Sequence, residues 1–183
     1  LEFIKGIEPG SKSYSNEFDD DKVYFYRVAD MFNGVKSNTF IEKIDSKNVF
    51  CNYDDVLIST DGTVGRVVVG IKGSYSGGIR KVVGLDESIT NEFIYFWLKS
   101  QYVQNMLEEY AANATTIAHA SGALKDLTIP YNAKILKDFG NIIEPTFKLM
   151  QQNLKQNNDL SDLRDSLLPR LMSGKIRVSK KYE

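Results

Sequence analysis

Side chains that commonly do chemistry in proteins are scarce in this sequence. It contains one histidine, His119, and one cysteine, Cys51. Zinc sites gather several His and Cys ligands, and most general acid–base designs use histidine. A single cysteine cannot form a disulfide within its own chain. We therefore expect no metal centre, and a cytoplasmic protein that is free of disulfides.

Known catalytic motifs are also missing. Glycines 73 and 78 have the spacing of a phosphate-binding loop, but Ile79 follows where that loop requires lysine. No Gly-x-Gly-x-x-Gly segment follows a predicted strand, and there is no Asn/Asp-Pro-Pro-Tyr/Phe segment of the kind that holds a flipped base. We interpret the acidic pairs Asp54-Asp55 and Asp86-Glu87 as solvated turn residues. The sequence predicts a chain that is not an enzyme by itself.

Composition and charge exclude other classes of protein. The 183 residues are 42% hydrophobic and 26% charged, which is typical of a soluble globular protein. No stretch approaches the ~20 apolar residues of a membrane-spanning helix. Residues 1–130 hold 13 basic and 18 acidic side chains, a net charge of −5, whereas residues 131–183 hold 10 and 6, a net charge of +4. The charge of the larger part does not by itself indicate a nucleic-acid binder.

The first 130 residues have the pattern of a domain rich in short strands. Branched and aromatic residues predict strands at 23–28, 56–59, 64–69 and 79–83, and a further short strand at 127–129. Thr60-Asp61-Gly62 is a turn signal after the second strand. At Gly77-Gly78, before the fourth, we expect a bulge or a close approach of two backbone segments.

Helical spacing replaces the strand pattern after residue 90. Thr90 is the predicted N-cap of one helix whose apolar residues recur as far as Tyr110. This helix should cover one face of the sheet. Its aromatic stripe, Phe93, Phe96 and Trp97, is expected to lie in the core.

The longest periodic segment is 132–172. Asn132 is a good N-cap, and apolar residues recur at gaps of three and four, interrupted at Asn157-Asn158. Pro145 should kink the helix or divide it. The stripe is similar to a coiled-coil seam whose asparagines fix the register. Because residues 154–171 have few local partners, we expect them to need a second helix.

Four segments, in this order along the chain, resemble one protein family. They are residues 55–67 (DVLISTDGTVGRV), 76–82 (SGGIRKV), 114–121 (ATTIAHAS) followed by 127–130 (LTIP), and 163–178 (LRDSLLPRLMSGKIRV). The pattern resembles the specificity (S) subunit of type I restriction–modification systems. The resemblance covers essentially the whole chain.

The resemblance implies an α+β fold with three parts. A mixed, strand-rich target-recognition domain occupies residues 1–131, and a long spacer helix at 132–173 pairs as an antiparallel coiled coil. A basic C-terminal tail occupies residues 174–183. The family usually has two recognition domains and two spacer helices, whereas this chain has one of each. It is therefore either half of a longer subunit or a short one that forms a homodimer or pairs with a second specificity half.

The resemblance also implies a function. The chain would be a non-catalytic half-subunit that recognises part of a bipartite target in double-stranded DNA. It would direct methyltransferase (modification) subunits and a restriction subunit to that target. The chain itself would hold no cofactor, since S-adenosylmethionine, ATP and Mg²⁺ belong to the partner subunits.

Base readout and phosphate contacts need Arg, Lys, Asn, Gln and hydroxyl groups. On the resemblance, the candidate DNA contacts are Lys5, Lys12, Thr60, Thr63, Arg66, Arg80, Lys81, Thr115, Thr116 and His119. The candidate helix-pairing residues are Leu154, Asn157, Leu160, Leu163, Leu167 and Leu171. The basic residues near the end of the chain could touch phosphate or the partner subunits; they are Arg170, Lys175, Arg177, Lys180 and Lys181.

Each of these candidates also has a purely structural alternative. The lysines and threonines can be solvated loop or turn residues, and the arginines can form surface ion pairs. His119 can be a buried, hydrogen-bonded histidine. Arg27 is a weaker candidate because Asp30 is an available partner. For the whole chain, the alternative is a coiled-coil protein-interaction module that does not bind DNA, which the net charge of residues 1–130 favours.

Overall fold

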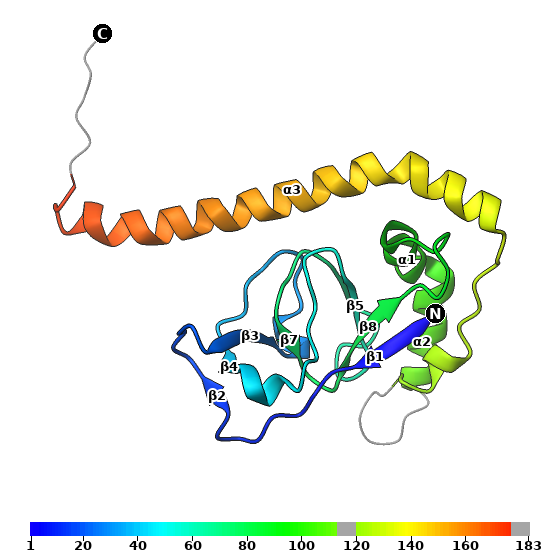
Figure 1. Cartoon of the computed structure of the whole chain (residues 1–183), viewed down its shortest axis with the longest axis horizontal. Helices are drawn as coiled ribbons and strands as arrows, with labels where there is room; N and C mark the ends of the chain where they lie inside the picture. The colour runs from blue at the N-terminus through cyan, green and yellow to red at the C-terminus, as the bar shows by residue number, and fades with distance from the viewer. Residues whose placement is uncertain (113–119, 177–183) are drawn as a thin grey trace, which may run out of the picture.

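The computed structural model describes residues 1–112 and 120–176. The candidate contacts Thr115, Thr116 and His119 lie outside these residues, as do Arg177, Lys180 and Lys181 of the basic tail. The described part is an α+β fold, in which two small sheets and two short helices form a domain that a long helix crosses (Figure 1).

The first sheet has four antiparallel strands in the order β1-β8-β5-β6. They are β1 (Glu2–Lys5), β8 (Ile79–Val83), β5 (Val56–Ser59) and β6 (Val67–Val68). The strands predicted at 56–59 and 79–83 are confirmed. The strand predicted at 64–69 is shorter because Gly65 N–H donates to the Ser59 carbonyl and closes a turn.

The second sheet has the order β2-β4-β3-β7. Its strands are β2 (Tyr14–Ser15), β4 (Phe40–Glu42), β3 (Lys22–Tyr26) and β7 (Ser74–Tyr75), and β3 pairs with β7 in parallel. Two 3-10 turns follow strands of this sheet, η1 (Val28–Asp30) after β3 and η2 (Lys43–Ser46) after β4. The strand predicted at 23–28 ends at Tyr26 because the Asp30 carboxylate accepts from Arg27 N–H, which caps η1.

Two helices cover one face of the first sheet, α1 (Asn91–Leu98) and α2 (Gln101–Ala112). Thr90 caps α1 as predicted, since its side chain accepts from Phe93 N–H. The prediction of one continuous helix is wrong. The Gln104 side chain donates to the Leu98 carbonyl at 2.7 Å, which satisfies the backbone where α1 stops.

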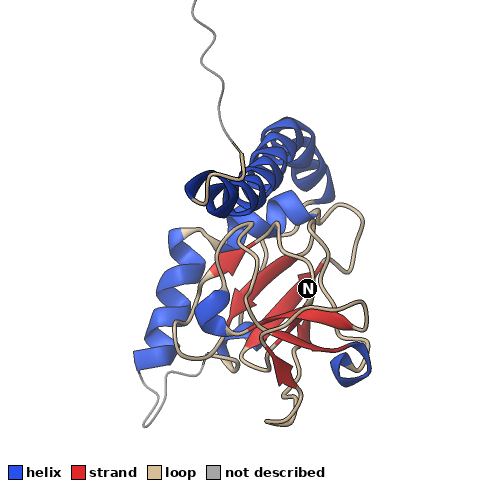
Figure 2. Cartoon of the chain, turned by 90° about the vertical axis from the view of Figure 1, so that its left-hand side faces the viewer, coloured by secondary structure: helices blue, strands red, loops and turns tan. Residues whose placement is uncertain are grey.

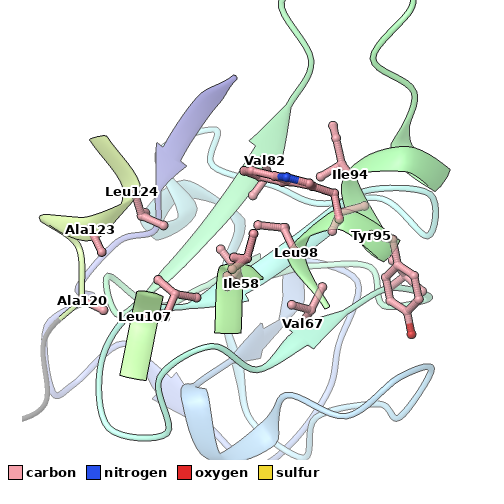
Figure 3. Packing of buried hydrophobic residues seen from close by; sticks show 14 of the residues in the cluster. Ile58, Val67, Val82, Ile94, Tyr95, Leu98, Leu107, Ala120, Ala123 and Leu124 are labelled. Carbon is pink, nitrogen blue, oxygen red and sulfur yellow. The ribbon is translucent and has the colours of Figure 1, made fainter. Parts of the chain in front are cut away.

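The core lies on both faces of the first sheet, because neighbouring residues in a strand point to opposite sides. Val56 and Ile58 pack with residues of α1, α2 and the 3-10 turn η3 (Ala123–Lys125), and the close view in Figure 3 shows Ile58 beside Leu98 and Leu107. Leu57 faces the second sheet together with Tyr26 and Tyr75. In the predicted aromatic stripe Trp97 is buried and Phe93 half-buried, but Phe96 is 37% exposed and lies against Phe147.

The strand predicted at 127–129 is wrong. This segment has no regular structure, although Leu127 and Ile129 pack their side chains against the core beside α1 and α2. It leads to α3 (Ala133–Met172), which Asn132 caps as predicted by accepting from Ile135 N–H at 3.1 Å.

The helix α3 runs through Pro145 without a break. Division of the helix at this proline is therefore wrong, and Figure 1 shows instead that the helix bends in its yellow, N-terminal part. Leu136 and Phe147, on either side of the proline, are both buried, so packing holds the helix together across the missing hydrogen bond. Figure 1 shows that α3 lies across the domain and then extends beyond it, and Figure 2 shows α3 nearly end-on above the domain.

Candidate nucleic-acid interface

Loops that are far apart in the sequence meet at one end of the first sheet. Gly6 N–H donates to the Ile79 carbonyl at 3.1 Å, and Gly77 N–H donates to the Ile7 carbonyl at 2.9 Å. Thr60 joins this cluster because its N–H donates to the Gly78 carbonyl at 2.8 Å and its carbonyl accepts from Ala120 N–H at 2.8 Å. We call this region the loop end, and define it as residues 6–13, 60–66, 76–78 and 120–125.

The loop end lies away from α3. Strand β8 begins at Ile79, beside these loops, and ends at Val83, from which the chain leads into α1. Helix α1 packs against α3. The ring centroids of Phe93 on α1 and Phe139 on α3 lie 6.0 Å apart. The loop end therefore occupies the end of the sheet that α3 leaves uncovered (Figure 1).

Gly6 permits the close approach of these loops, and Gly77 lies against the end of the Glu8 side chain. A Cβ atom on Gly6 would lie 2.0 Å from the Ser76 carbonyl oxygen, and a Cβ atom on Gly77 would lie 2.5 Å from a Glu8 carboxylate oxygen. Gly77 N–H donates to that Glu8 carboxylate at 2.9 Å. The close backbone approach predicted at Gly77-Gly78 is confirmed.

Arg80 is the cation most firmly held near the loop end. Its guanidinium donates to the Gly77 carbonyl and, at 3.0 Å, to the Ile79 carbonyl. Partial burial lowers its pKa from the usual value, but an arginine remains charged at neutral pH. It lines a hollow of about 580 Å³ whose other polar groups come from Ser121 and Lys125, over apolar side chains that include Phe3.

Arg66 is held at the other side of the loop end. Its guanidinium donates to the Val28 carbonyl at 3.3 Å and lies over the Phe32 ring, 4.9 Å from the ring centroid. These contacts hold the guanidinium group in place by a hydrogen bond and a cation–π interaction. The structure thus brings Arg66, Arg80 and Lys5, at the end of β1, to the same end of one sheet.

The predicted threonines and Lys12 differ in accessibility. Thr60 is fully buried, and its hydroxyl donates to the Gly78 carbonyl at 3.2 Å, so it holds the turn and cannot touch DNA without unfolding. Thr63 is exposed, and its carbonyl accepts from the Ser59 hydroxyl. Lys12 is exposed in the turn that Ser13 N–H closes on the Gly10 carbonyl.

Lys81 does not belong with Arg80. The two side chains lie on opposite faces of β8, where Arg80 pairs with Ile58 and Lys81 pairs with Leu57. Lys81 Nζ lies 3.4 Å from Asp55 Oδ2 and donates to the Phe50 carbonyl at 3.0 Å. The interpretation of Lys81 as a DNA contact is therefore corrected to an ion pair inside the domain. Arg27 likewise pairs with Asp30, at 3.0 Å.

The predicted helix seam is in fact two faces of α3. One face packs on the domain through Leu136, Gly140 and Phe147, which are buried, and through Leu154, which is half-buried. Leu154 is therefore not available to a second helix, which corrects its prediction as a pairing residue. Asn157, also predicted to pair, instead lines a groove between α3 and the loop at 33–38.

The second face of α3 is turned to solvent. It carries large apolar side chains that are more than half exposed; they are Ile135, Ile142, Leu149, Leu160 and Leu163. Leu167 and Leu171 continue this face at gaps of four residues. Of the predicted pairing residues, Leu160, Leu163, Leu167 and Leu171 therefore share one stripe that the domain leaves uncovered. Arg170 and Lys175 are exposed near its end.

Sequence reasoning missed two polar residues of the hollow beside Arg80. Ser121 and Lys125 lie in a segment without a strand or helix pattern. The only signal in the sequence that could have identified them is the chemistry of their side chains, a hydroxyl and an ammonium group. Among the residues that the structure describes, no group of His, Cys, Asp and Glu is placed to hold a metal ion. Within the same ranges, no helix has the length and apolar character to span a membrane.

Comparison with known proteins decides the family. Residues 4–157 match the family model of the type I restriction modification DNA specificity domain. The chain belongs to this family. The matched region of this specificity domain begins within β1 and ends within α3, and it takes in every strand from β2 to β8 together with α1 and α2.

Named relatives agree with this assignment. The specificity domain is 28% identical over 192 residues to the type I restriction enzyme MjaIX specificity subunit of Methanocaldococcus jannaschii, covering 96% of this chain and 43% of that protein. It is 29% identical over 185 residues to the HindI specificity subunit of Haemophilus influenzae, covering 96% and 39%. The chain therefore spans about two fifths of the length of these relatives.

A solved structure shares the fold. The HsdS subunit from Thermoanaerobacter tengcongensis superposes with a TM-score of 0.54 at 16% identity, over 96% of this chain and 43% of that one. The fold expected from the resemblance, a strand-rich domain followed by a long C-terminal helix, is confirmed.

Proposed function

We propose that this specificity domain binds double-stranded DNA through its loop end and recognises one half of a bipartite target. The observation that carries the proposal is the meeting of Arg66, Arg80 and Lys5 at the end of the sheet that α3 leaves uncovered. Arginine is the side chain that most often pairs with guanine, and both cation types bind phosphate. Hydrogen bonds to backbone carbonyls hold the two guanidinium groups in place before DNA arrives.

Part of the acidic charge of the domain lies away from this end, although the loop end itself holds Glu8 and Asp61. Asp54 and Asp55 precede β5, and Asp86 and Glu87 follow β8, so these four acidic residues lie at the opposite end of the same two strands. The net charge of −5 over residues 1–130 therefore includes acidic groups placed away from the loop end. Local charge, and not the sum over the domain, determines where a polyanion binds.

The hollow beside Arg80 suits a phosphate group. Arg80, Lys125 and Ser121 offer two cations and a hydroxyl around it, which is the donor set that DNA-binding proteins use for phosphate oxygens. Lys5, Lys12 and Thr63 can add contacts to neighbouring phosphates, and Arg66 remains the candidate for base readout.

We also propose that the solvent-facing side of α3 pairs with a second spacer helix. Two rows with a seven-residue period run along it: Ile135, Ile142, Leu149, Gln156 and Leu163, and beside them Thr146, Asn153, Leu160 and Leu167. The second row begins at Thr146 because Phe139, one period earlier, packs against Phe93 of α1. These rows are the a and d positions of a coiled coil. The polar layer at Asn153 and Gln156 takes the register-setting role that the sequence had suggested for Asn157 and Asn158.

Antiparallel pairing of two copies satisfies this pattern. With the two-fold axis near residues 154 and 155, Asn153 of each copy lies opposite Gln156 of the other, and Leu160 lies opposite Leu149. Each domain contacts its own α3 from Leu136 to Asp162, so the larger part of each domain would lie on its own side of the two-fold axis. Two identical readers related by a two-fold axis would recognise a palindromic target with a gap.

The domain would direct chemistry done by other subunits. In this proposal the methyltransferase subunits carry S-adenosylmethionine, and a restriction subunit uses ATP and Mg²⁺. This chain contributes binding and orientation, and is not itself an enzyme.

Expression of the chain with its methyltransferase subunits tests the proposal. Sequencing of methylated sites in the host DNA should reveal one bipartite sequence, and a band-shift titration should show a selective complex that weakens steeply as salt rises. Absence of both a methylated motif and a selective complex at every salt concentration would reject the function.

A further inference from the structure

The loop at 33–38 holds α3 at a second place, beyond Pro145. This loop is itself tied to the end of β6, because Gly34 N–H donates to the Val69 carbonyl at 3.0 Å and Val69 N–H donates to the Asn33 side chain at 3.1 Å. The Asn33 amide also donates to the Tyr95 hydroxyl at 3.2 Å, which joins the loop to α1. The loop is therefore a fixed part of the domain.

Two glycines form a seat for Leu154. Gly34 and Gly70 have φ angles of +68° and +77°, which side chains other than glycine rarely adopt. A Cβ atom on Gly34 would lie 2.8 Å from Leu154 Cβ, and one on Gly70 would lie 3.0 Å from Leu154 Cδ1. Any larger residue at either position would push the helix away from the domain.

Polar contacts continue the same stripe of the helix. The Asn158 side-chain amide donates to the Gly34 carbonyl, and Asp162 Oδ2 lies 2.6 Å from Lys36 Nζ. Leu154, Asn158 and Asp162 are spaced by four residues, so they lie above one another on one side of α3. All three contact the loop at 33–38, and Leu154 also contacts Gly70 beside it. We call this set of contacts the latch.

The latch matters because α3 is long and has a weak point. The first attachment of α3 lies around Leu136 and Phe147, with Pro145 between them removing a backbone hydrogen bond. From Leu154 to Met172 the helix extends about 27 Å, at 1.5 Å per residue. A tilt of about 10° at the latch would move its end by about 5 Å, which exceeds the 3.4 Å rise of one base pair.

We infer that the latch is a positioning device, in which the residues Gly34, Lys36, Leu154, Asn158 and Asp162 set the angle between the recognition domain and α3, and through it the gap between the two half-sites. The inference rests on the proposed function for its consequence on DNA, but the angle itself is a property of the isolated chain.

Distance measurements between two spin labels test the angle directly. Ser11→Cys on the domain and Ser166→Cys on α3 are exposed positions outside the latch, and Cys51 is buried, so only the two new thiols react. An excess of unlabelled chain prevents labels on two copies from meeting. The unaltered latch should give one narrow distance distribution.

Charge reversal provides the decisive comparison. Lys36→Glu and Asp162→Lys should each broaden or shift the distribution, by about 3 Å for each 10° of tilt because the label at Ser166 lies about 18 Å beyond Leu154, and the double variant should restore it. Lys148→Glu is the matched control, since it reverses an ion pair with Glu144 elsewhere on α3 and should change nothing. If both single variants and Leu154→Ala leave the distribution unchanged while thermal melts show an intact domain, the latch is refuted.

Methylated-site sequencing then separates this inference from the proposed function. Latch variants should keep both half-site sequences and change only the length of the gap. A gap that stays the same in a variant with a shifted distance distribution would overturn the link to DNA spacing. Absence of any methylated motif with the unaltered chain would instead reject the proposed function.

Discussion

Arg80 and Lys5 lie directly opposite each other across the antiparallel pair of β8 and β1. Two like charges placed in this way destabilise a sheet. The nearby Asp61 carboxylate offsets part of this repulsion, and we propose that a phosphate bound at the loop end offsets the rest.

Arg80→Ala tests this phosphate contact. DNA affinity should fall for all sequences, and the slope of log K against log salt should become shallower by about 0.9, the value for one lost phosphate contact. Fluorescence anisotropy at several salt concentrations measures both quantities. The matched control is Lys81→Ala, the neighbouring cation on the other face, whose slope should equal that of the unaltered chain because Lys81 is paired with Asp55. Equal slopes for all three proteins would contradict the assignment of Arg80.

Leu160→Glu tests the helix seam. Leu160 is 62% exposed on the face that the domain leaves uncovered, so the change should leave the domain folded and abolish pairing. Light scattering coupled to gel filtration gives the mass. Lys155→Glu, on a side of α3 outside both apolar faces, should pair like the unaltered chain. A dimer that survives Leu160→Glu would show that the seam lies elsewhere.

Phe147→Ala tests the attachment of α3 to the domain. Phe147 is 2% exposed, and its ring lies 5.5 Å from that of Tyr95 and 6.5 Å from that of Phe96. The truncation should lower the free energy of unfolding by roughly 3–5 kcal/mol, which a urea titration measures. Leu149→Ala, two residues along on the exposed face, should change it by less than about 0.5 kcal/mol. Similar losses for both variants would mean that α3 packs differently.

Cys51 provides a test of the core between the two sheets, where it is buried with Leu57 and Tyr75. Burial raises the pKa of its thiol to about 12, whereas an unfolded cysteine titrates near 8.5. The unfolded thiol thus loses its proton first, so stability should fall as the pH rises from about 8.5 towards 12. Unfolding titrations across that range, compared with Cys51→Ala, isolate this contribution. A native thiol that reacts quickly with a disulfide reagent at pH 8 would contradict the burial.

The sequence predicted those elements whose signal is local. Strands β5 and β8 are runs of branched residues bounded by turn residues. Thr90 and Asn132 cap their helices by accepting from backbone N–H groups three residues further along the chain. The strands β1, β2, β4 and β7 were missed because two to four residues without clear alternation contain no periodic signal. Their pairing partners lie far along the chain.

The helix α3 shows a different limit of sequence reasoning. Its apolar residues were predicted as one seam because gaps of three and four fit a single stripe, yet Leu154 packs on the domain while Leu160 faces solvent. Adjacent pairs such as Ile142 and Ile143 satisfy both faces, so periodicity cannot assign them. The candidate site was limited in the same way, since the sequence places Arg80 beside Lys81, but alternation along β8 separates them.

Because α3 has two apolar faces, substitutions in the recognition domain and substitutions in the pairing surface of α3 are constrained independently. The residues that we propose to contact DNA are on the domain, and the domain packs on one side of α3, while the other side faces away from it. Mutations in the loop end can therefore accumulate without disturbing the solvent-facing side of α3. A recognition domain for a different DNA sequence could replace this one on the same α3, provided that the new domain still has small residues where Gly34 and Gly70 contact Leu154.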